Sequence, residues 1–324
     1  MERPTVFFVV GPTASGKTDA AVCAALAMDG EVISADAIQI YRGLDKGSAK
    51  PTEEEMRGVR HHLIDVVDYT YPDYNVACFV RDASRCIEDI VARGKTPIVA
   101  GGTGLYVNAL LYPLDFTGAK PDRELRDRLM AEESESPGSL YERLKAEDPA
   151  SAERLHPNDS KRIVRALEVL YKTGATLSEQ GGDFMNARRA EIPYVPVIAG
   201  LTMDRARLYS RIDRRVDLML ENGLLEEAKD LLSSCEGEPP LALQAIGYKQ
   251  FAAYLDGTAT YDETVALIKR ETRRFAKRQI AWFKRDDRIR WFNRDDYGSA
   301  EELDSAVTQY FIEEKKRIER ADET

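Results

Sequence analysis

The sequence contains little of what a membrane protein, an exported protein or a zinc protein needs. No apolar run approaches the ~20 residues that span a bilayer. The first apolar segment, residues 5–10, is too short for a signal peptide and lacks a basic flank. The four cysteines form no C-x-x-C pair and there are only three histidines, which argues against a zinc site and for free thiols in a reducing compartment. We therefore expect a cytoplasmic protein without a membrane partner.

Size and charge point to a two-domain protein with an uneven charge distribution. The chain has 324 residues, 43% of them hydrophobic, and a net charge of -10, which fits two domains with a large core. An acidic total disfavours nucleic acid as a partner. Between residues 269 and 290, however, ten lysines and arginines stand against three acidic residues. This segment predicts a polyanion partner, and the alternative is an ordinary solvated helix face.

Residues 11–18, Gly-Pro-Thr-Ala-Ser-Gly-Lys-Thr, fit the phosphate-loop pattern G-x-x-x-x-G-K-[ST] at every fixed position. An apolar strand pattern at 5–10 precedes them and an Ala-rich helix pattern at 19–28 follows, which is the context that the motif requires. The backbone N–H groups and the helix N-terminus bind the anion, the lysine reaches terminal phosphate oxygens and the last hydroxyl holds Mg²⁺. The predicted diphosphate-binding residues are Gly11, Thr13, Ala14, Ser15, Gly16, Lys17 and Thr18, with Thr18 as the Mg²⁺ ligand.

The rest of the chain predicts an α/β fold, a P-loop NTPase-like parallel sheet flanked by helices, with an inserted all-helical subdomain. Strand and helix patterns alternate over the first ~115 residues, and residues 121–172 are charged, helical and free of strand patterns. We expect a catalytic core of residues 1–117 and 191–324 and a helical insertion of residues 118–190. The expected strands are 31–35, 63–67, 96–100 and 194–199, and the expected helices are 77–92, one from 105, 205–221, 224–232, 262–283 and 299–320.

Three polar residues stand at places where catalysis is possible. Asp36 ends a predicted strand beside the phosphate loop, where it can hold Mg²⁺, act as a base or simply form a turn. Thr103 heads a helix after a double glycine, so its hydroxyl donates to a phosphate or caps the helix. Arg215 lies off the apolar stripe of its helix and either neutralises a leaving pyrophosphate or forms a surface salt bridge.

A set of ordered motifs resembles the tRNA dimethylallyltransferases, which transfer an isopentenyl group to the adenosine next to the anticodon. The resemblance covers nearly the whole chain, from Val10 to about Arg285. The motifs are the phosphate loop, Ser34-Ala-Asp36, Lys50-Pro-Thr52, His61-His-Leu-Ile-Asp65, Gly101-Gly-Thr-Gly-Leu-Tyr106, Asn158-Asp159 with Arg162 and Arg165-Ala-Leu-Glu-Val169, Gly247-Tyr248, and Lys277-Arg-Gln279 with Trp282.

The resemblance implies a role for each of these positions. The phosphate loop holds dimethylallyl diphosphate, Asp36 accepts the proton from adenine N6, and Thr103 and Arg215 act on the leaving pyrophosphate together with Lys17 and Mg²⁺ on Thr18. The adenine leaves its stack to enter a channel between the domains. The implied tRNA-binding residues are Asp36, Ala37, Ile38, Gln39, Thr103, Arg126, Lys161, Arg162, Ile163, Val164, Arg165, Gln244, Ala245, Ile246, Gly247, Tyr248, Lys249, Lys277, Arg278, Gln279, Trp282 and Lys284.

The sequence departs from the family pattern at one site position and resembles its bacterial form. Ala37 stands where the family usually has serine, which puts one hydroxyl contact to tRNA in doubt. The C-terminal helix contains no Cys or His, unlike the zinc finger of eukaryotic relatives. His61 and His62 are expected to be structural, because adjacent residues of an extended segment face opposite ways. We expect a monomer.

Three other functions compete with the one that the resemblance implies, and the ordered motif set disfavours them. An adenylate isopentenyltransferase would share the fold but would not need the helical insertion or the basic segment. A P-loop nucleotide kinase or NTPase would bind ATP and use Asp36 for Mg²⁺. A non-enzymatic RNA-binding module would leave the phosphate loop without a purpose.

Overall fold

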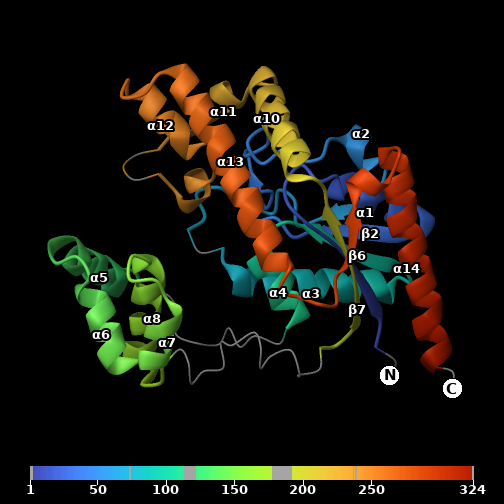
Figure 1. Ribbon diagram of the computed structural model, residues 1–324, viewed down its shortest axis with the longest axis horizontal. Coiled ribbons are helices and arrows are strands. Elements are labelled where there is room, and N and C mark those ends of the chain that lie inside the picture. Colours follow the sequence, from blue (N-terminus) through green and yellow to red (C-terminus); the bar gives the residue numbers. More distant parts are fainter. Residues whose placement is uncertain are drawn as a thin grey trace. The chain divides into compact units, whose positions relative to one another are not determined.

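The computed structural model describes residues 3–72, 74–112, 122–176, 192–235, 237 and 239–322. The chain divides into two compact units, one of residues 1–110 with 193–324 and the other of residues 111–192 (Figure 1). The boundaries expected at 118 and 190 lie outside the described residues.

The first unit is built on a six-stranded sheet. Its strands are β1 (Thr5–Val10), β2 (Gly30–Ser34), β4 (His61–His62), β6 (Thr96–Gly101), β7 (Val195–Thr202) and β8 (Arg290–Asn293). They are all parallel and lie in the order β4-β2-β6-β1-β7-β8. The α/β class with a parallel sheet is therefore confirmed. Because β1 lies between β6 and β7, the loops after β1 and β6 meet at one edge of the sheet.

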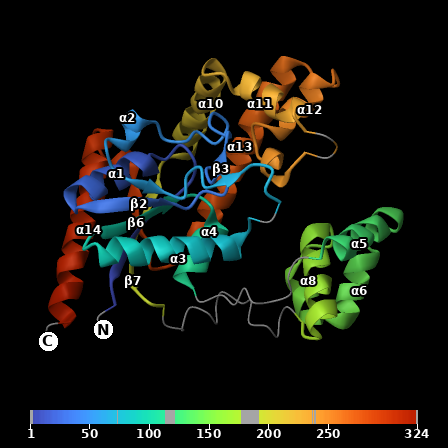
Figure 2. The ribbon, with the colours of Figure 1, turned by 180° about the vertical axis from the view of Figure 1, so that it is seen from behind.

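Helices cover the sheet and bury strand β1 on both faces. Helices α1 (Lys17–Ala27) and α14 (Ala300–Asp322) pack on each other and on one face, where the rings of Phe7 and Phe311 lie 4.9 Å apart. Helix α3 (Val76–Ala92) packs against β2 and β6 and runs across the sheet in Figure 2. A strand buried on both faces needs a continuous apolar run, which residues 5–10 provide.

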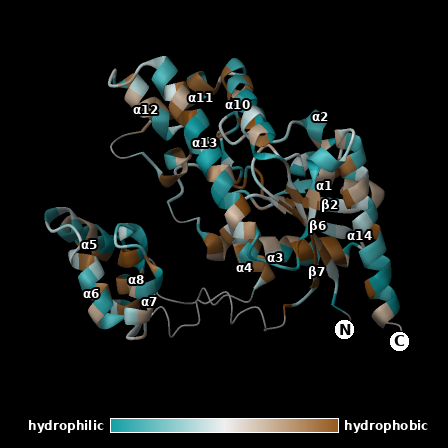
Figure 3. Cartoon of the chain, in the orientation of Figure 1, coloured by the Kyte–Doolittle hydropathy of each residue, from teal (hydrophilic) through white to brown (hydrophobic). Residues whose placement is uncertain are grey.

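Most of the remaining elements of the first unit lie in the connections between successive strands of the sheet. They are β3 (Tyr41–Arg42), α2 (Glu53–Met56), β5 (Val67–Asp68), α4 (Gly104–Leu111), α10 (Arg205–Glu221), α11 (Leu224–Ser233), α12 (Lys249–Leu255), α13 (Tyr261–Phe283) and two 3-10 turns at Leu241–Gln244 and Arg294–Asp296. Helix α13 begins with a capping box between Thr260 and Glu263 and packs along α10. Figure 3 shows its mixed polar and apolar character against the hydrophobic strands.

The expected third strand is misplaced in the sequence-based prediction. In the six-stranded sheet the pairing occurs at His61–His62, which lie beside Val32 and Ile33. Within 63–67, Val67 pairs with Tyr41 in a separate two-stranded sheet of β3 and β5. Leu63 has a φ of +61° and Asp65 a φ of +56°. These left-handed conformations interrupt an extended segment, so the apolar pattern there does not continue as a strand. Strand β8 and helix α12 were not predicted.

The second unit is a small helical domain. Its helices are α5 (Arg123–Glu135), α6 (Ser139–Glu147), α7 (Pro149–Arg154) and α8 (Ser160–Thr173). Leu129, Leu140, Leu144 and Leu167 form part of its core. Within this core Glu168 is completely buried, and it accepts hydrogen bonds from Arg126, Arg165 and the Asp122 backbone. These partners keep the pKa of Glu168 below its ordinary value although burial opposes this.

An acid-sensitive ion cluster joins the sheet to α3. Glu31 is buried and binds Arg93 and His62, and the Arg93 hydrogen bond is the main reason that the pKa of Glu31 falls to about 2. A depressed carboxyl pKa stabilises the fold above pH 4.5, and this stability is lost as the pH falls toward 2. We expect the stability difference between the wild type and Glu31→Gln to shrink by roughly 2 kcal/mol between pH 6 and pH 3. Urea unfolding at both pH values measures it, and parallel pH curves would contradict it.

Candidate active site

The phosphate loop has the backbone shape of an anion cradle. Gly11, Ala14 and Gly16 have φ values of +146°, +62° and +96°, and α1 begins directly after Gly16. A Cβ at residue 11 would lie 2.6 Å from the Leu201 carbonyl oxygen, so glycine is required there. The loop thus turns its N–H groups toward the space in front of α1.

That space is a cavity of about 290 Å³. Thr13–Thr18 line it, together with Asp36 and Gln39 after β2, the loop after β6, and side chains of α10 and α13. Gly11, also predicted to bind diphosphate, shapes the loop without lining the cavity. Ser15 has a buried hydroxyl with no hydrogen-bond partner. A buried unsatisfied hydroxyl is costly, and a phosphate oxygen would satisfy it.

Lys17 is poised to respond to an anion. Its Nζ donates to the Pro12 carbonyl oxygen at 2.7 Å. Burial, and then repulsion by Arg215, lower the pKa of Lys17 to about 7, while the charge of Asp36 opposes the shift. A bound diphosphate would favour the charged form of the lysine.

Helix α10 supplies two arginines, one turn apart. Arg211 Nε donates to the Ala14 carbonyl oxygen at 2.9 Å, and Arg215 has a buried Nε with no hydrogen bond. Burial lowers the pKa of Arg215, and the charge of Asp36 opposes this most strongly. A role was predicted for Arg215 but not for Arg211, although a spacing of four residues places both on one helix face.

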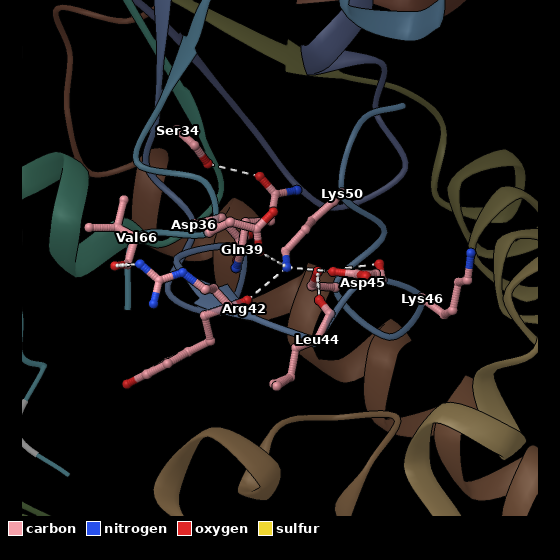
Figure 4. Close-up of polar contacts among 12 residues, drawn as sticks. Ser34, Asp36, Gln39, Arg42, Leu44, Asp45, Lys46, Lys50 and Val66 are labelled. Carbon is pink, nitrogen blue, oxygen red and sulfur yellow. Dashed lines mark hydrogen bonds and ion pairs between the residues drawn. The ribbon is translucent and has the colours of Figure 1, made fainter. Parts of the chain in front are cut away.

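Asp36 lies two residues after the end of β2 and lines the cavity. Its Oδ1 accepts hydrogen bonds from the backbone of Ile38 at 2.9 Å and of Gln39 at 3.3 Å, so the residue forms a turn as well. The Ser34 hydroxyl donates to the Gln39 Oε1 at 2.8 Å (Figure 4). The carboxylate is therefore held by the backbone of its own turn.

A buried lysine organises the segment that follows this turn. Lys50 Nζ donates to the Tyr41 carbonyl oxygen at 2.7 Å and to carboxylates of Asp45 and Asp65 at 2.6 and 2.5 Å (Figure 4). This segment brings Ser48 to the cavity wall. The lysine of the Lys50-Pro-Thr52 motif therefore has a structural role, because its ammonium group binds other residues of the protein.

Thr103 connects the two strand ends that form the site. Its Oγ1 accepts a hydrogen bond from the Ala37 N–H at 3.0 Å, and its own N–H donates to the Ala35 carbonyl oxygen at 3.2 Å. The hydroxyl proton of Thr103 stays available for an oxygen acceptor. The contact to residue 37 uses only its backbone, so alanine and serine serve it equally.

Gln279 of α13 has a different place from the predicted contact to tRNA. It is buried, its Oε1 accepts from the Thr13 N–H at 2.9 Å, and its Nε2 donates to the Gly102 carbonyl oxygen at 2.9 Å. One carboxamide thus joins the phosphate loop to the glycine loop after β6. Both ends of this side chain are used within the protein, which argues against the tRNA role.

The residues that line the cavity suit a metal ion that is bound mainly by the oxygens of a diphosphate and by few protein groups. Within the described ranges, no cluster of three or more His, Cys, Asp or Glu residues is placed to hold a metal ion. The half-buried Thr18 lines the cavity. Mg²⁺ commonly keeps several waters and binds one or two protein groups plus substrate phosphates, and a threonine hydroxyl with diphosphate oxygens suits that pattern.

The residues predicted to bind tRNA differ in solvent exposure, and some of them are buried. Ile163, Val164 and Tyr248 are buried, so their side chains do not reach RNA while the fold is intact. Arg126 and Arg165 both pair with Glu168. Trp282 packs over Gly104, where a Cβ would lie 2.4 Å from its ring. The exposed members are Lys161, Arg162, Gln244, Lys249, Lys277, Arg278 and Lys284, whereas Ala245, Ile246 and Trp282 are half-buried and Gly247 is buried.

The basic segment of α13 is only partly free for a partner. Arg273 pairs with Asp213 at 2.5 Å and Lys269 with Asp217 at 2.5 Å, which ties α13 to α10. In the part of the chain that the structure describes, no acidic side chain pairs with Lys277, Arg278 or Lys284. Uncompensated charge is thus concentrated at the C-terminal end of α13.

The two histidines lie in the sheet as structural groups. His61 Nδ1 contacts the Val59 carbonyl oxygen at 2.9 Å, and His62 Nε2 binds Glu31 at 2.7 Å. Neither lines the cavity. In the described part of the chain, no helix is long and apolar enough to cross a membrane.

Comparisons with known proteins agree on one family. The IPP transferase family model matches residues 39–286, and an isopentenyl transferase model matches residues 4–68. The tRNA dimethylallyltransferase of Alkaliphilus oremlandii is 45% identical over 95% of this chain and 97% of its own length. That of Symbiobacterium thermophilum is 50% identical over 89% of each chain.

Solved structures give the same result. The tRNA isopentenylpyrophosphate transferase of Bacillus halodurans has a TM-score of 0.74 and 38% identity, and covers all of both chains. A eukaryotic dimethylallyltransferase acting on tRNA has a TM-score of 0.74 and 31% identity over 90% of this chain and 74% of its own. The chain belongs to the IPP transferase family.

Proposed function

We propose that this protein transfers a dimethylallyl group from dimethylallyl diphosphate to the exocyclic N6 of the adenosine on the 3′ side of the anticodon in tRNAs. The observation that supports this proposal is that the phosphate loop and Asp36 line the same cavity. A diphosphate held by the loop and a nucleophile deprotonated by the carboxylate would then react within one space.

Asp36 acts as the general base in this mechanism. The adenine N6 amine is a weak nucleophile, and it attacks C1 of the dimethylallyl group. As the C–N bond forms and the C1–oxygen bond breaks, the N6 proton passes to the Asp36 carboxylate. The turn at Ile38 and Gln39 holds the carboxylate in place for this transfer.

The departing pyrophosphate is stabilised by groups of three elements. The N–H groups of the phosphate loop and Lys17 bind it at α1, and Arg215 approaches from α10. Thr103 follows the lining residues Gly101 and Gly102 without lining the cavity itself, and its hydroxyl is proposed to supply a further donor. Thr18 would hold Mg²⁺, and the ion would neutralise part of the negative charge on the pyrophosphate. Developing negative charge thus meets donors that are already in place.

The tRNA is bound by exposed cations of both units. Lys277 and Arg278 lie on α13, the same helix that reaches the cavity through Gln279, and Lys284 follows directly after its last residue. Lys161 and Arg162 are exposed at the start of α8, and the helical second unit is proposed to bind the RNA through these two side chains. Arg126 and Arg165 keep their proposed tRNA roles only if RNA phosphate competes with Glu168. Cytoplasmic location and a monomeric state stay predictions.

We expect the double variant Lys277→Gln/Arg278→Gln to bind tRNA more weakly and with a smaller salt dependence. Each lost phosphate contact should reduce the slope of log affinity against log salt by somewhat under one unit. Filter binding between 50 and 200 mM salt, about the range in which this effect is large, measures it. Arg270→Gln/Arg274→Gln is the matched control, because both arginines pair with Glu271. Equal slopes in the two variants would contradict the assignment.

Mass spectrometry of tRNA nucleosides tests the proposed function. The protein is incubated with dimethylallyl diphosphate, Mg²⁺ and tRNA, with AMP as a rival acceptor in a second reaction and ATP as a rival donor in a third. Prenylated adenosine in tRNA supports the proposal. Prenylated AMP alone would indicate an adenylate isopentenyltransferase, and phosphoryl transfer from ATP would indicate a kinase.

A further inference from the structure

The cavity walls differ sharply in polarity at one position. Most residues that line the cavity are glycine, alanine, hydroxyl-bearing or charged residues. Of the described residues that line it, only Phe275 has a large apolar side chain. An aromatic ring in an otherwise polar wall favours contact with an apolar ligand group, because that contact removes apolar surface of both partners from water.

Phe275 is fixed in position by its neighbours on α13. Ala276 is buried in a cluster with Ala14 and Ile212, so this turn of the helix is held against the phosphate loop. Gln279, one turn further along the same face, bonds to Thr13. The Arg278 guanidinium lies 5.8 Å from the centroid of the Phe275 ring, which adds a cation–π contact.

We propose that Phe275 packs against the hydrocarbon chain of dimethylallyl diphosphate and limits the length of the prenyl group that the enzyme accepts. The inference rests on the proposed function. The reactants offer a charged diphosphate, a base with polar edges and one five-carbon hydrocarbon group. The hydrocarbon group is bonded directly to the diphosphate, so it lies beside the phosphate loop and gains from an aromatic wall there.

Comparing two ligands that differ only in the prenyl group separates this role from diphosphate binding. Calorimetry with Mg²⁺ measures the affinity of each variant for dimethylallyl diphosphate and for inorganic pyrophosphate. We expect Phe275→Ala to weaken dimethylallyl diphosphate by roughly tenfold, the usual effect of losing one packed apolar contact. Pyrophosphate affinity should hold, which also shows that the variant is folded. Phe275→Leu, which keeps an apolar wall, should lose about threefold or less.

Activity toward tRNA gives the second measurement. With geranyl diphosphate as donor, Phe275→Ala should raise the ratio of kcat/KM for geranyl over dimethylallyl diphosphate by roughly tenfold or more relative to the wild type. If the alanine variant fails to bind pyrophosphate, Phe275→Trp replaces it. The larger ring should weaken dimethylallyl diphosphate while pyrophosphate affinity holds.

Two results would overturn the inference. Equal losses for dimethylallyl diphosphate and pyrophosphate in a folded variant would show that Phe275 only supports the phosphate loop. An unchanged donor affinity and donor ratio with a raised KM for tRNA would place the ring against the adenine. If the wild-type protein modifies no tRNA, that result contradicts the proposed function and not the role of Phe275. The mass spectrometry of tRNA nucleosides described above measures it separately.

Discussion

Asp36→Asn is expected to lower kcat for tRNA prenylation by roughly 10²–10⁴-fold, the usual contribution of a positioned general base. The asparagine keeps a carbonyl oxygen for the hydrogen bonds from Ile38 and Gln39, so the turn should survive. Only the charge and the proton-accepting ability are removed. Single-turnover rates at saturating tRNA and dimethylallyl diphosphate measure the chemical step directly.

A charge change elsewhere provides the control for Asp36. Glu88→Gln removes one exposed carboxylate on α3, away from the cavity lining, and should leave the rate within about twofold, as surface substitutions generally do. Both substrates should bind Asp36→Asn with near wild-type affinity. Near wild-type turnover in Asp36→Asn would show that another group takes the N6 proton.

Lys17→Met is expected to weaken dimethylallyl diphosphate binding by roughly 10²–10³-fold, which is typical for loss of one partner of a buried charge pair. The methionine keeps much of the side-chain volume, so the loop should not collapse. tRNA binding should change little, because the lysine faces the phosphate site. Calorimetric titration of each ligand measures both effects, and Lys316→Met, on the exposed face of α14, is the matched control.

The same lysine predicts a pH dependence with a definite sign. In the free enzyme the pKa of Lys17 is lowered to about 7, first by burial and then by Arg215, whereas the diphosphate complex needs the charged ammonium. Binding above pH 7 therefore takes up a proton, and affinity should fall by up to about tenfold per pH unit. Titrations at pH 8 in buffers of different ionisation enthalpy should show uptake of about one proton in the wild type and almost none in Lys17→Met. Equal uptake in both proteins would assign the proton to another group.

The stability of the free enzyme should respond to the same pKa shift in the opposite direction. Between pH 7 and 10.5 the unfolded chain keeps the Lys17 proton that the folded chain has released. Stability contributed by this group therefore rises with pH across that window. An anion in the cavity would remove the shift and the dependence together.

The sequence by itself determined the local parts of the site. Gly11 and Gly16 adopt the positive φ angles that the phosphate loop needs, and Lys17 and Thr18 follow at the start of α1 as the motif requires. Asp36 lies two residues after the end of β2, and its carboxylate accepts a hydrogen bond from the backbone of the same turn. These features depend on neighbouring residues and on one apolar strand, so a short pattern contains the information.

Tertiary structure decided which distant side chains complete the cavity. Gln279 reaches Thr13 across 266 residues of sequence, Arg211 binds the Ala14 carbonyl across 197, and Phe275 enters the same wall. The helical periodicity of the sequence places such residues on one helix face, but it does not predict which part of the protein packs against that face. The packing of α10 and α13 against the phosphate loop supplies that answer.

Tertiary structure also decided which cations are free to bind an anion. Arg273 and Lys277 look equivalent in the basic segment, yet Arg273 pairs with Asp213 of α10. Likewise the hydrophobic run at 63–67 resembles a strand, but left-handed backbone at Leu63 and Asp65 moves the pairing to His61–His62. Ion pairs between helices and strand register both depend on contacts between segments far apart in sequence. Local patterns therefore fixed the chemistry at each strand end, and packing selected the side chains that act with it.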